Sequence, residues 1–200
     1  MTINLKEINK LDSFFAQLSE YDISLLRLIH HNRFSLLDDV FYLISFTTSF
    51  ISIALLVVIL STSIKLKSSE IRNKFFKILT VLLVAATLSL SLKNSIFRER
   101  PFVNYPDIVK LSEAGNSSFP SGHTIEAFAI ALAFSILFPR RKFIIPVFLW
   151  AFLVAYSRMA LGVHYPADVF AGIIIGVIVS YFTITIYTWI ENKNNSSITK

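Results

Sequence analysis

The chain contains no cysteine, which excludes disulfide bonds and thiolate chemistry but is compatible with any redox compartment. Glycine is also scarce, with 5 residues in 200, and charged residues make up 16% of the chain. Hydrophobic residues reach 54% and occur in long blocks, which is more apolar surface than one soluble core of this size could bury. The composition therefore indicates an integral membrane protein.

Five apolar segments each approach the roughly 20 residues needed to cross a hydrocarbon core about 30 Å thick. The third and fourth segments are separated by Pro139 and three basic residues, which predicts a tight hairpin between two membrane helices. The fold class that follows is an all-α, polytopic membrane helix bundle of about five transmembrane helices. The predicted spans are 38–62, 76–97, 123–139, 143–160 and 168–190.

The segments that flank the spans differ from them in pattern. Residues 11–30 place apolar side chains at mostly three- and four-residue spacing among charged ones, which predicts an amphipathic helix on the membrane surface. The tail 191–200 is rich in Asn, Ser and Lys, which predicts disorder. The chain is thus divided into an amphipathic segment (1–36), a transmembrane domain (37–190) and the tail.

The order of the spans predicts which loops share a side of the membrane. With five spans, the loops at about 98–122 and 161–167 emerge on one face. The opposite face receives the basic residues between 65 and 77 and the turn at 140–142, so the positive-inside rule makes that face cytoplasmic. The net charge of +6 is then explained by anchoring and orientation, and nucleic-acid binding is not expected.

Three short motifs lie at the edges of apolar segments, where ionisable side chains are costly unless they have a function. The first motif contains Lys93 and Arg100, followed by Pro101. On a helix, Lys93 and Arg100 would share one face about 10 Å apart, and both suit phosphate oxygens. Pro101 would then end that helix. The alternative is that both cations are snorkelling anchors at a helix end.

The second motif is Pro120-Ser121-Gly122-His123, directly before an apolar run. Ser121 is in position to cap a helix whose first backbone N–H groups point outward, and such a terminus binds anions. Gly122 would let an oxygen approach the main chain closely, with His123 beside it. The alternative is an ordinary capped helix with a loop histidine.

The third motif contains Arg158, His164 and Asp168. The four-residue spacing lets the Asp168 carboxylate accept a hydrogen bond from one nitrogen of His164, which leaves the other nitrogen free to attack or to act as a base. A structural pair or a metal site are the alternatives. A metal site is not expected, because a third ligand is lacking while His30 and His31 lie far off in the amphipathic segment.

Together, the three motifs resemble the three-part signature of the type 2 phosphatidic acid phosphatase superfamily, which includes membrane lipid phosphatases and soluble vanadium haloperoxidases. The resemblance covers roughly residues 90–175. It implies that His164 forms a phosphohistidine, that Asp168 orients it, and that His123 protonates the leaving oxygen and then activates water. It also implies a set of groups that hold the phosphoryl oxygens, namely Lys93, Arg100, Ser121, the amide of Gly122, and Arg158.

The resemblance implies hydrolysis of a lipid phosphate or diphosphate without metal or cofactor, in the bacterial inner membrane with an outward-facing site. Undecaprenyl diphosphate is the preferred substrate, and phosphatidylglycerophosphate, phosphatidic acid and lipid A are alternatives that the motifs do not rank. A vanadate-dependent oxidant and a transporter are more distant alternatives. No obligate protein partner is expected. Glu126 is outside the signature and is given no role.

Overall fold

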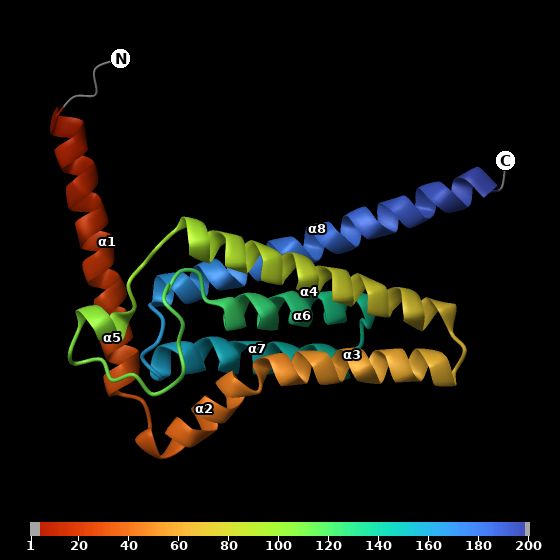
Figure 1. The fold of residues 1–200 in the computed structure, drawn as a ribbon, viewed down its shortest axis with the longest axis horizontal. Helices are drawn as coiled ribbons and strands as arrows, with labels where there is room; N and C mark the ends of the chain where they lie inside the picture. Colours follow the sequence, from red (N-terminus) through yellow and green to blue (C-terminus); the bar gives the residue numbers. More distant parts are fainter. Residues whose placement is uncertain (1–4, 199–200) are drawn as a thin grey trace.

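The regular structure is entirely helical in residues 5–198, the part of the chain that this computed structural model describes. The prediction of an all-α fold is therefore confirmed. Most of the longer helices run along a common direction as a bundle, and the first helix lies across one end of it (Figure 1). The elements are α1 (Leu5–His31), η1 (Ser35–Leu37), α2 (Asp38–Phe46), α3 (Thr48–Lys65), α4 (Ser69–Ser95), α5 (Pro101–Asn104), α6 (Gly122–Leu137), α7 (Arg141–Ala160) and α8 (Pro166–Ile198).

Within residues 5–198, four helices are long and apolar enough to cross a membrane. Helix α6 is also apolar but shorter, at 16 residues, and completes the bundle. Only 22–33% of each long span is buried inside the protein, so apolar side chains cover the outside of the bundle. Because such a surface is stable in hydrocarbon, the chain is an integral membrane protein. The four spans are Thr48–Lys65, Ser69–Ser95, Arg141–Ala160 and Pro166–Asn194.

The first predicted span, 38–62, is not one helix. The chain changes direction at Thr47, between α2 and α3, and only Thr48–Lys65 is a candidate span. The hydroxyl of Thr47 donates to the carbonyl of Leu43 at 2.6 Å, and that of Thr48 donates to Ile44 at 3.0 Å. Hydroxyls that bond back to the preceding turn bend helices, which a hydropathy pattern does not reveal.

Helix α6 is the centre of the bundle, in contact with α3, α4, α7 and α8. Four of its alanines, at positions 127, 129, 131 and 133, are completely buried. Helix α8 meets α6 at Gly176, where a Cβ atom would lie 2.6 Å from the carbonyl oxygen of Ile125. Small residues on both helices therefore let the two backbones approach closely, as in other membrane helix pairs.

Helix α8 continues beyond the predicted boundary at residue 190 and into the segment predicted to be disordered. Lys77 of α4 forms an ion pair with Glu191 at 2.6 Å and donates to the hydroxyl of Thr188 at 3.3 Å. These contacts tie α8 to α4 at residues 188–191, and the helix itself extends to Ile198. The last part of the predicted tail, residues 199–200, lies outside the described residues.

Helix α1 corresponds to the amphipathic helix predicted for residues 11–30. Ile23 and Leu26 are buried against the loop that follows α5, whereas Phe14, Phe15 and Leu25 are exposed. Its apolar residues are thus divided between a protein-facing and an outward-facing side, and its location on the membrane surface stays a prediction. The beginning of the predicted N-terminal segment, residues 1–4, lies outside the described residues.

Candidate active site

The three motifs converge at the end of the bundle that α1 crosses, where α4 ends and α6 and α8 begin (Figure 1). A cavity of about 600 Å³ opens among them. Two predicted site residues, Ser121 and Asp168, are fully buried and do not line this cavity. The six that do line it are Lys93, Arg100, Gly122, His123, Arg158 and His164.

His164 and Asp168 lie close together, as their spacing predicts, but the predicted hydrogen bond between them is not formed. Nδ1 of His164 lies 3.6 Å from Oδ2 of Asp168, which is an ion-pair distance and longer than a good hydrogen bond. His164 is 2% exposed as a side chain and Asp168 is 0% exposed. The pair is therefore held in a water-poor environment, where its electrostatic interactions are strong.

The tautomer of His164 follows from its contact with Arg100. Nη1 of Arg100 lies 3.2 Å from Nε2 of His164. A guanidinium only donates hydrogen bonds, so Nε2 must be the acceptor and Nδ1 must carry the proton, directed toward Asp168. The nitrogen with the free electron pair thus lies on the cavity side of the ring.

Burial keeps the His164 ring neutral. Desolvation, with smaller effects from Arg158 and Arg100, lowers the pKa of His164 to about 3, although Asp168 opposes this shift. At neutral pH the imidazole therefore retains its electron pair. A neutral ring next to a fixed carboxylate can act as a nucleophile or a base, with the carboxylate stabilising the positive charge that develops.

The first motif is arranged differently from the prediction. Helix α4 ends at Ser95 and not at 97, and Ile96 already has extended backbone angles, so Lys93 and Arg100 do not share a helix face. Pro101 does not stop that helix but begins the short helix α5. Arg100 instead reaches the cavity from an extended segment. Its guanidinium donates to the carbonyls of Gly115 at 2.7 Å, Val163 at 2.7 Å and Ser117 at 2.9 Å.

Lys93 reaches the same loop from the last turn of α4, where its ammonium donates to the Ser117 carbonyl at 3.2 Å. The carbonyl of Ser117 thus receives hydrogen bonds from both Lys93 and Arg100. One main-chain oxygen therefore holds the two cations next to each other at the cavity wall. The convergence that the sequence predicts is achieved through the loop before α6.

The second motif forms the start of α6. Ser121 is the N-cap residue, but its hydroxyl makes no capping bond and is paired with the hydroxyl of Thr124 at 2.7 Å. The predicted capping bond is therefore wrong, and the buried Ser121 side chain does not face the cavity. Gly122 and His123 do line it, and a Cβ atom at Gly122 would lie 3.8 Å from Cε of Lys93. The helix start and the first-motif lysine are thus neighbours.

Arg158, from the third motif, is almost completely buried near the end of α7. It donates to the hydroxyl of Ser45 at the end of α2, and more weakly to the Ser112 hydroxyl at 3.4 Å. Its Nε atom has no hydrogen-bond partner within the described part of the chain. A buried cation with an unused donor at a cavity wall is suited to an anionic ligand.

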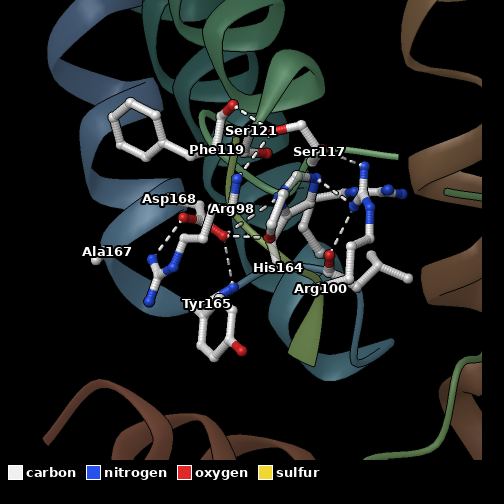
Figure 2. Close-up of polar contacts among 12 residues, drawn as sticks. Arg98, Arg100, Ser117, Phe119, Ser121, His164, Tyr165, Ala167 and Asp168 are labelled. Carbon is white, nitrogen blue, oxygen red and sulfur yellow. Dashed lines mark hydrogen bonds and ion pairs between the residues drawn. The ribbon is translucent and has the colours of Figure 1, made fainter. Parts of the chain in front are cut away.

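Sequence reasoning missed the groups that hold Asp168. Arg98 donates to Oδ1 of Asp168 at 2.7 Å, and the Ser118 hydroxyl and the Tyr165 backbone N–H donate to Oδ2. Figure 2 shows Arg98 and Arg100 on opposite sides of the His164–Asp168 pair. Arg98 lies within the first motif, so its charge at a span edge was the one signal that could have identified it.

The cavity continues from the cations along apolar walls that α3 and α4 contribute. On α4, Leu83 and Leu90 line it, and Ile53 lines it from α3. Glu126 also faces this space and accepts a hydrogen bond from the hydroxyl of Ser49 at 2.8 Å. The site therefore joins a cationic end to an apolar part that two candidate spans, α3 and α4, line.

No group of three His, Asp or Glu side chains that could hold a metal ion is found in residues 5–198. His30, one of the two histidines outside the motifs, is buried, and both of its ring nitrogens are hydrogen-bonded. Its Nδ1 donates to the carbonyl of Ala160 at 2.8 Å, and its Nε2 accepts from the backbone N–H of Val109 at 3.2 Å. His30 thus connects α1 to the end of α7.

The family model of the PAP2 superfamily matches residues 74–192, which include every predicted site residue. The chain belongs to the PAP2 superfamily. The six predicted site residues that line the cavity also lie inside the matched region.

Two curated relatives each match a part of the chain. A lipid A 4′-phosphatase of Bacteroides thetaiotaomicron is 41% identical over 78 residues, which is 39% of this chain and 35% of that protein. The undecaprenyl-diphosphatase BcrC of Bacillus subtilis is 36% identical over 85 residues, which is 42% of this chain and 43% of that protein. The chain thus spans less than half the length of each of these relatives.

A solved PAP2-type structure agrees over a longer stretch. The crystal structure of LpxE from Aquifex aeolicus superposes with a TM-score of 0.74 at 30% sequence identity. The superposition covers 82% of this chain and 95% of that chain. The arrangement of helices around the site is therefore shared well beyond the three motifs.

Proposed function

We propose that this protein hydrolyses the terminal phosphate of a membrane lipid phosphate or diphosphate, with His164 as the nucleophile. The observation that carries the proposal is the neutral, buried His164 with Nδ1 directed at Asp168 and Nε2 at Arg100 on the cavity side. Membership of the PAP2 superfamily supports it, as do relatives named as phosphatases.

The reaction would proceed in two balanced steps. Nε2 of His164 forms a bond to phosphorus while the bond from phosphorus to the leaving oxygen breaks, and His123 gives that oxygen a proton. His123 then takes a proton from a water molecule whose oxygen attacks phosphorus, and the N–P bond breaks. Asp168 stabilises the positive charge on the ring during the first step. Inorganic phosphate and neutral His164 are the products.

Three cations would hold the phosphoryl oxygens, and all three line the cavity: Lys93, Arg100 and Arg158. The backbone N–H of Gly122 at the start of α6 is a fourth donor of the kind that binds phosphate. Fixed positive groups in a water-poor site stabilise the spreading negative charge of the transition state, which magnesium does in kinases. The Ser121 hydroxyl has no direct role in this mechanism because it is buried and paired with Thr124.

Undecaprenyl diphosphate is the substrate that we favour. In a polyprenyl diphosphate the apolar chain follows the phosphates directly, and the cavity passes directly from Lys93 to apolar walls such as Leu90 and Leu83. In lipid A, sugars separate the phosphate from the acyl chains and would need polar partners there, whereas Glu126 and Ser49, two polar residues that line the cavity, are already bonded to each other. BcrC, named an undecaprenyl-diphosphatase, supports this choice, whereas the lipid A 4′-phosphatase supports the alternative.

The test is a phosphate-release assay of the purified full chain in detergent against undecaprenyl diphosphate, phosphatidylglycerophosphate, phosphatidic acid and lipid A. We expect release from undecaprenyl diphosphate with the highest kcat/KM, unchanged by a chelator. His164→Ala is the blank, and His31→Ala is its matched control, since His31 is exposed on α1, where its ring contacts Asp107.

A phosphoenzyme trap makes the test of the nucleophile direct. Acid quenching during turnover of labelled substrate is expected to leave acid-labile phosphate on the wild type and on His31→Ala but not on His164→Ala. Full activity of His164→Ala, or phosphate release from none of the four lipids, would refute the proposed function. Release from lipid A alone would refute only the choice of substrate.

A further inference from the structure

We propose that Arg98 and Asp22 are positioning residues for the His164–Asp168 pair, so that helix α1 helps to set the geometry of the site. The inference rests on the proposed function, because it concerns the same reaction. Neither residue lines the cavity that contains His164. Both would act through Asp168, and Asp22 lies outside the region matched by the PAP2 family model, residues 74–192.

The guanidinium of Arg98 bridges two carboxylates from opposite ends of the chain. Its Nη1 lies 2.7 Å from Oδ1 of Asp168, and its Nη2 lies 2.6 Å from Oδ2 of Asp22. The face of the guanidinium stacks on the ring of Tyr165, 3.8 Å from the ring centre. The planar guanidinium is held by two carboxylates and by one aromatic ring, so it has little freedom to turn. A lysine ammonium is not planar and could not reproduce this arrangement.

Asp168 depends on Arg98 for the compensation of its charge. Both groups that donate to Oδ2 are neutral, namely the Ser118 hydroxyl and the backbone N–H of Tyr165. Arg98 is the cation that donates directly to this fully buried carboxylate. A buried carboxylate that loses its cation is strongly destabilised and either moves or takes up a proton. In both cases it would no longer hold Nδ1 of His164, which lies 3.6 Å from Oδ2.

Asp22 fixes this arrangement from helix α1. Besides its pair with Arg98, its Oδ1 accepts a hydrogen bond from the backbone N–H of Ala167 at 2.8 Å. Ala167 belongs to the first turn of α8, where the helix leaves N–H groups unpaired and favours a negative charge. One carboxylate of α1 thus caps the turn that carries Asp168 and also holds the cation that pairs with it.

Arg98 stays charged in this position. Burial acts to lower the pKa of Arg98, but Asp168 and Asp22 outweigh this effect, and the pKa is raised above its ordinary value. Asp22, Arg98 and Asp168 therefore form a chain of alternating charge that ends at the ring of His164. Residues that contact a catalytic group without touching the substrate orient that group, and removing them lowers the rate of the reaction.

A second ion pair ties α1 to the rest of the protein and provides a matched control. Arg27 of α1 pairs with Asp107 at 2.7 Å, and both side chains are about 40% exposed (42% and 39%). The two hydrogen bonds of this pair join Arg27 to Asp107 and involve neither His164 nor Asp168, so their loss would loosen α1 without removing a contact of Asp168. Comparing the two pairs separates a positioning role of Asp22 from mere attachment of α1.

The experiment measures kcat and KM of the full chain in detergent, together with its thermal midpoint, for Asp22→Asn, Arg98→Gln and Arg98→Lys beside Asp107→Asn. For Asp22→Asn and Arg98→Gln we expect kcat to fall about tenfold or more, with KM changed less than about twofold, because the cavity cations are untouched. Arg98→Lys should retain an intermediate kcat, since lysine can pair with one carboxylate only. Asp107→Asn should keep the kcat of the wild type.

A double variant tests whether Asp22 acts through Arg98. If it does, Asp22→Asn should cost nothing further in the Arg98→Gln background, because coupled residues are not additive. Wild-type kcat in Asp22→Asn, or equal losses in Asp22→Asn and Asp107→Asn, would overturn the inference while leaving the proposed function intact. If Arg98→Gln does not fold, the near-isosteric Asp22→Asn decides alone. Absence of phosphate release by the wild type would overturn both proposals.

Discussion

Nη1 of Arg100 lies 3.2 Å from Nε2 of His164, so a buried cation directly contacts the nitrogen that we propose as the nucleophile. The same guanidinium is fixed by the carbonyls of Gly115, Val163 and Ser117. Arg100 therefore holds the loop before α6, the loop before α8 and the reactive ring in one geometry. This contact defines which face of His164 an incoming phosphate would meet.

The first prediction concerns this arginine. Arg100→Lys should lower kcat/KM by about 100-fold, the loss typical of removing one donor to transition-state charge, because lysine has no planar fork for three carbonyls and a phosphoryl oxygen. Arg141→Lys, at the hairpin between α6 and α7 at the opposite end, is the control and should be unchanged. A comparable loss in both variants would contradict the role of Arg100.

The second prediction concerns pH and stability. The pKa of His164 in the folded protein is lowered from 6.5 to about 3, so below about pH 6.5 the unfolded chain binds more protons than the folded one. The contribution of His164 to the free energy of unfolding is therefore fully present above about pH 6.5. It is lost as the pH falls toward the pKa of His164 in the folded protein, about 3. Between about pH 7.5 and about pH 5 this group alone should cost about 2 kcal/mol.

Thermal midpoints in detergent at the two pH values measure this effect. His164→Ala should show a smaller decrease on acidification than the wild type, because the titrating group is gone. The exposed His31 provides the comparison, since His31→Ala should behave like the wild type. An equal acid sensitivity in all three proteins would contradict the assignment of His164 as a neutral buried ring.

The third prediction concerns the α6–α8 contact. A Cβ atom at Gly176 would lie 2.6 Å from the carbonyl oxygen of Ile125 and 3.0 Å from the amide nitrogen of Ala129, so Gly176→Ala must push two backbones apart. We expect a loss of about 1–3 kcal/mol, seen as a lower thermal midpoint. Gly115→Ala is the control, because nothing lies within 4 Å of the added atom. A midpoint equal to that of the control would contradict the close contact.

The fourth prediction concerns orientation. The basic residues of the α3–α4 connection and of the α6–α7 hairpin lie at the end opposite the site (Figure 1), so the site should face outward from an inner membrane. Because the chain has no cysteine, Gly115→Cys and Arg141→Cys each introduce a single reactive thiol. A membrane-impermeant thiol reagent applied to intact cells should label the first variant and spare the second. Labelling of Arg141→Cys but not of Gly115→Cys would show that the site faces the cytoplasm and would contradict the prediction.

Much of the fold could be predicted because hydropathy and charge act locally. The hairpin around Pro139 is confirmed, since α6 ends at Leu137 and α7 begins at Arg141. The break at Thr47 was not predictable from apolar content, because it depends on side-chain hydroxyls that bond to the preceding turn. The ion pair of Lys77 and Glu191, which joins α8 to α4 at the start of the predicted tail, likewise links distant residues and could not be predicted from local pattern.

The candidate site was predicted as a set of residues rather than as a geometry. Spacing anticipated the proximity of His164 and Asp168, since four residues make one helical turn. It wrongly placed Lys93 and Arg100 on one helix, because periodicity cannot show where a helix ends. Ser118 and Asp22 carried no distinguishing signal, since serines in loops and aspartates on amphipathic helices are common.

The sequence by itself determined that this chain is an integral membrane protein and which ionisable groups lie at the ends of its apolar segments. The reason is that the cost of burying a charge in hydrocarbon depends on each segment alone. The tertiary structure alone decided the tautomer of His164, the burial of the Ser121 hydroxyl and the bridge from Asp22 through Arg98 to Asp168. The bridge joins residues that are far apart in the chain, since Asp22 and Arg98 are 76 positions apart and Arg98 and Asp168 are 70 apart, and no local pattern encodes such contacts.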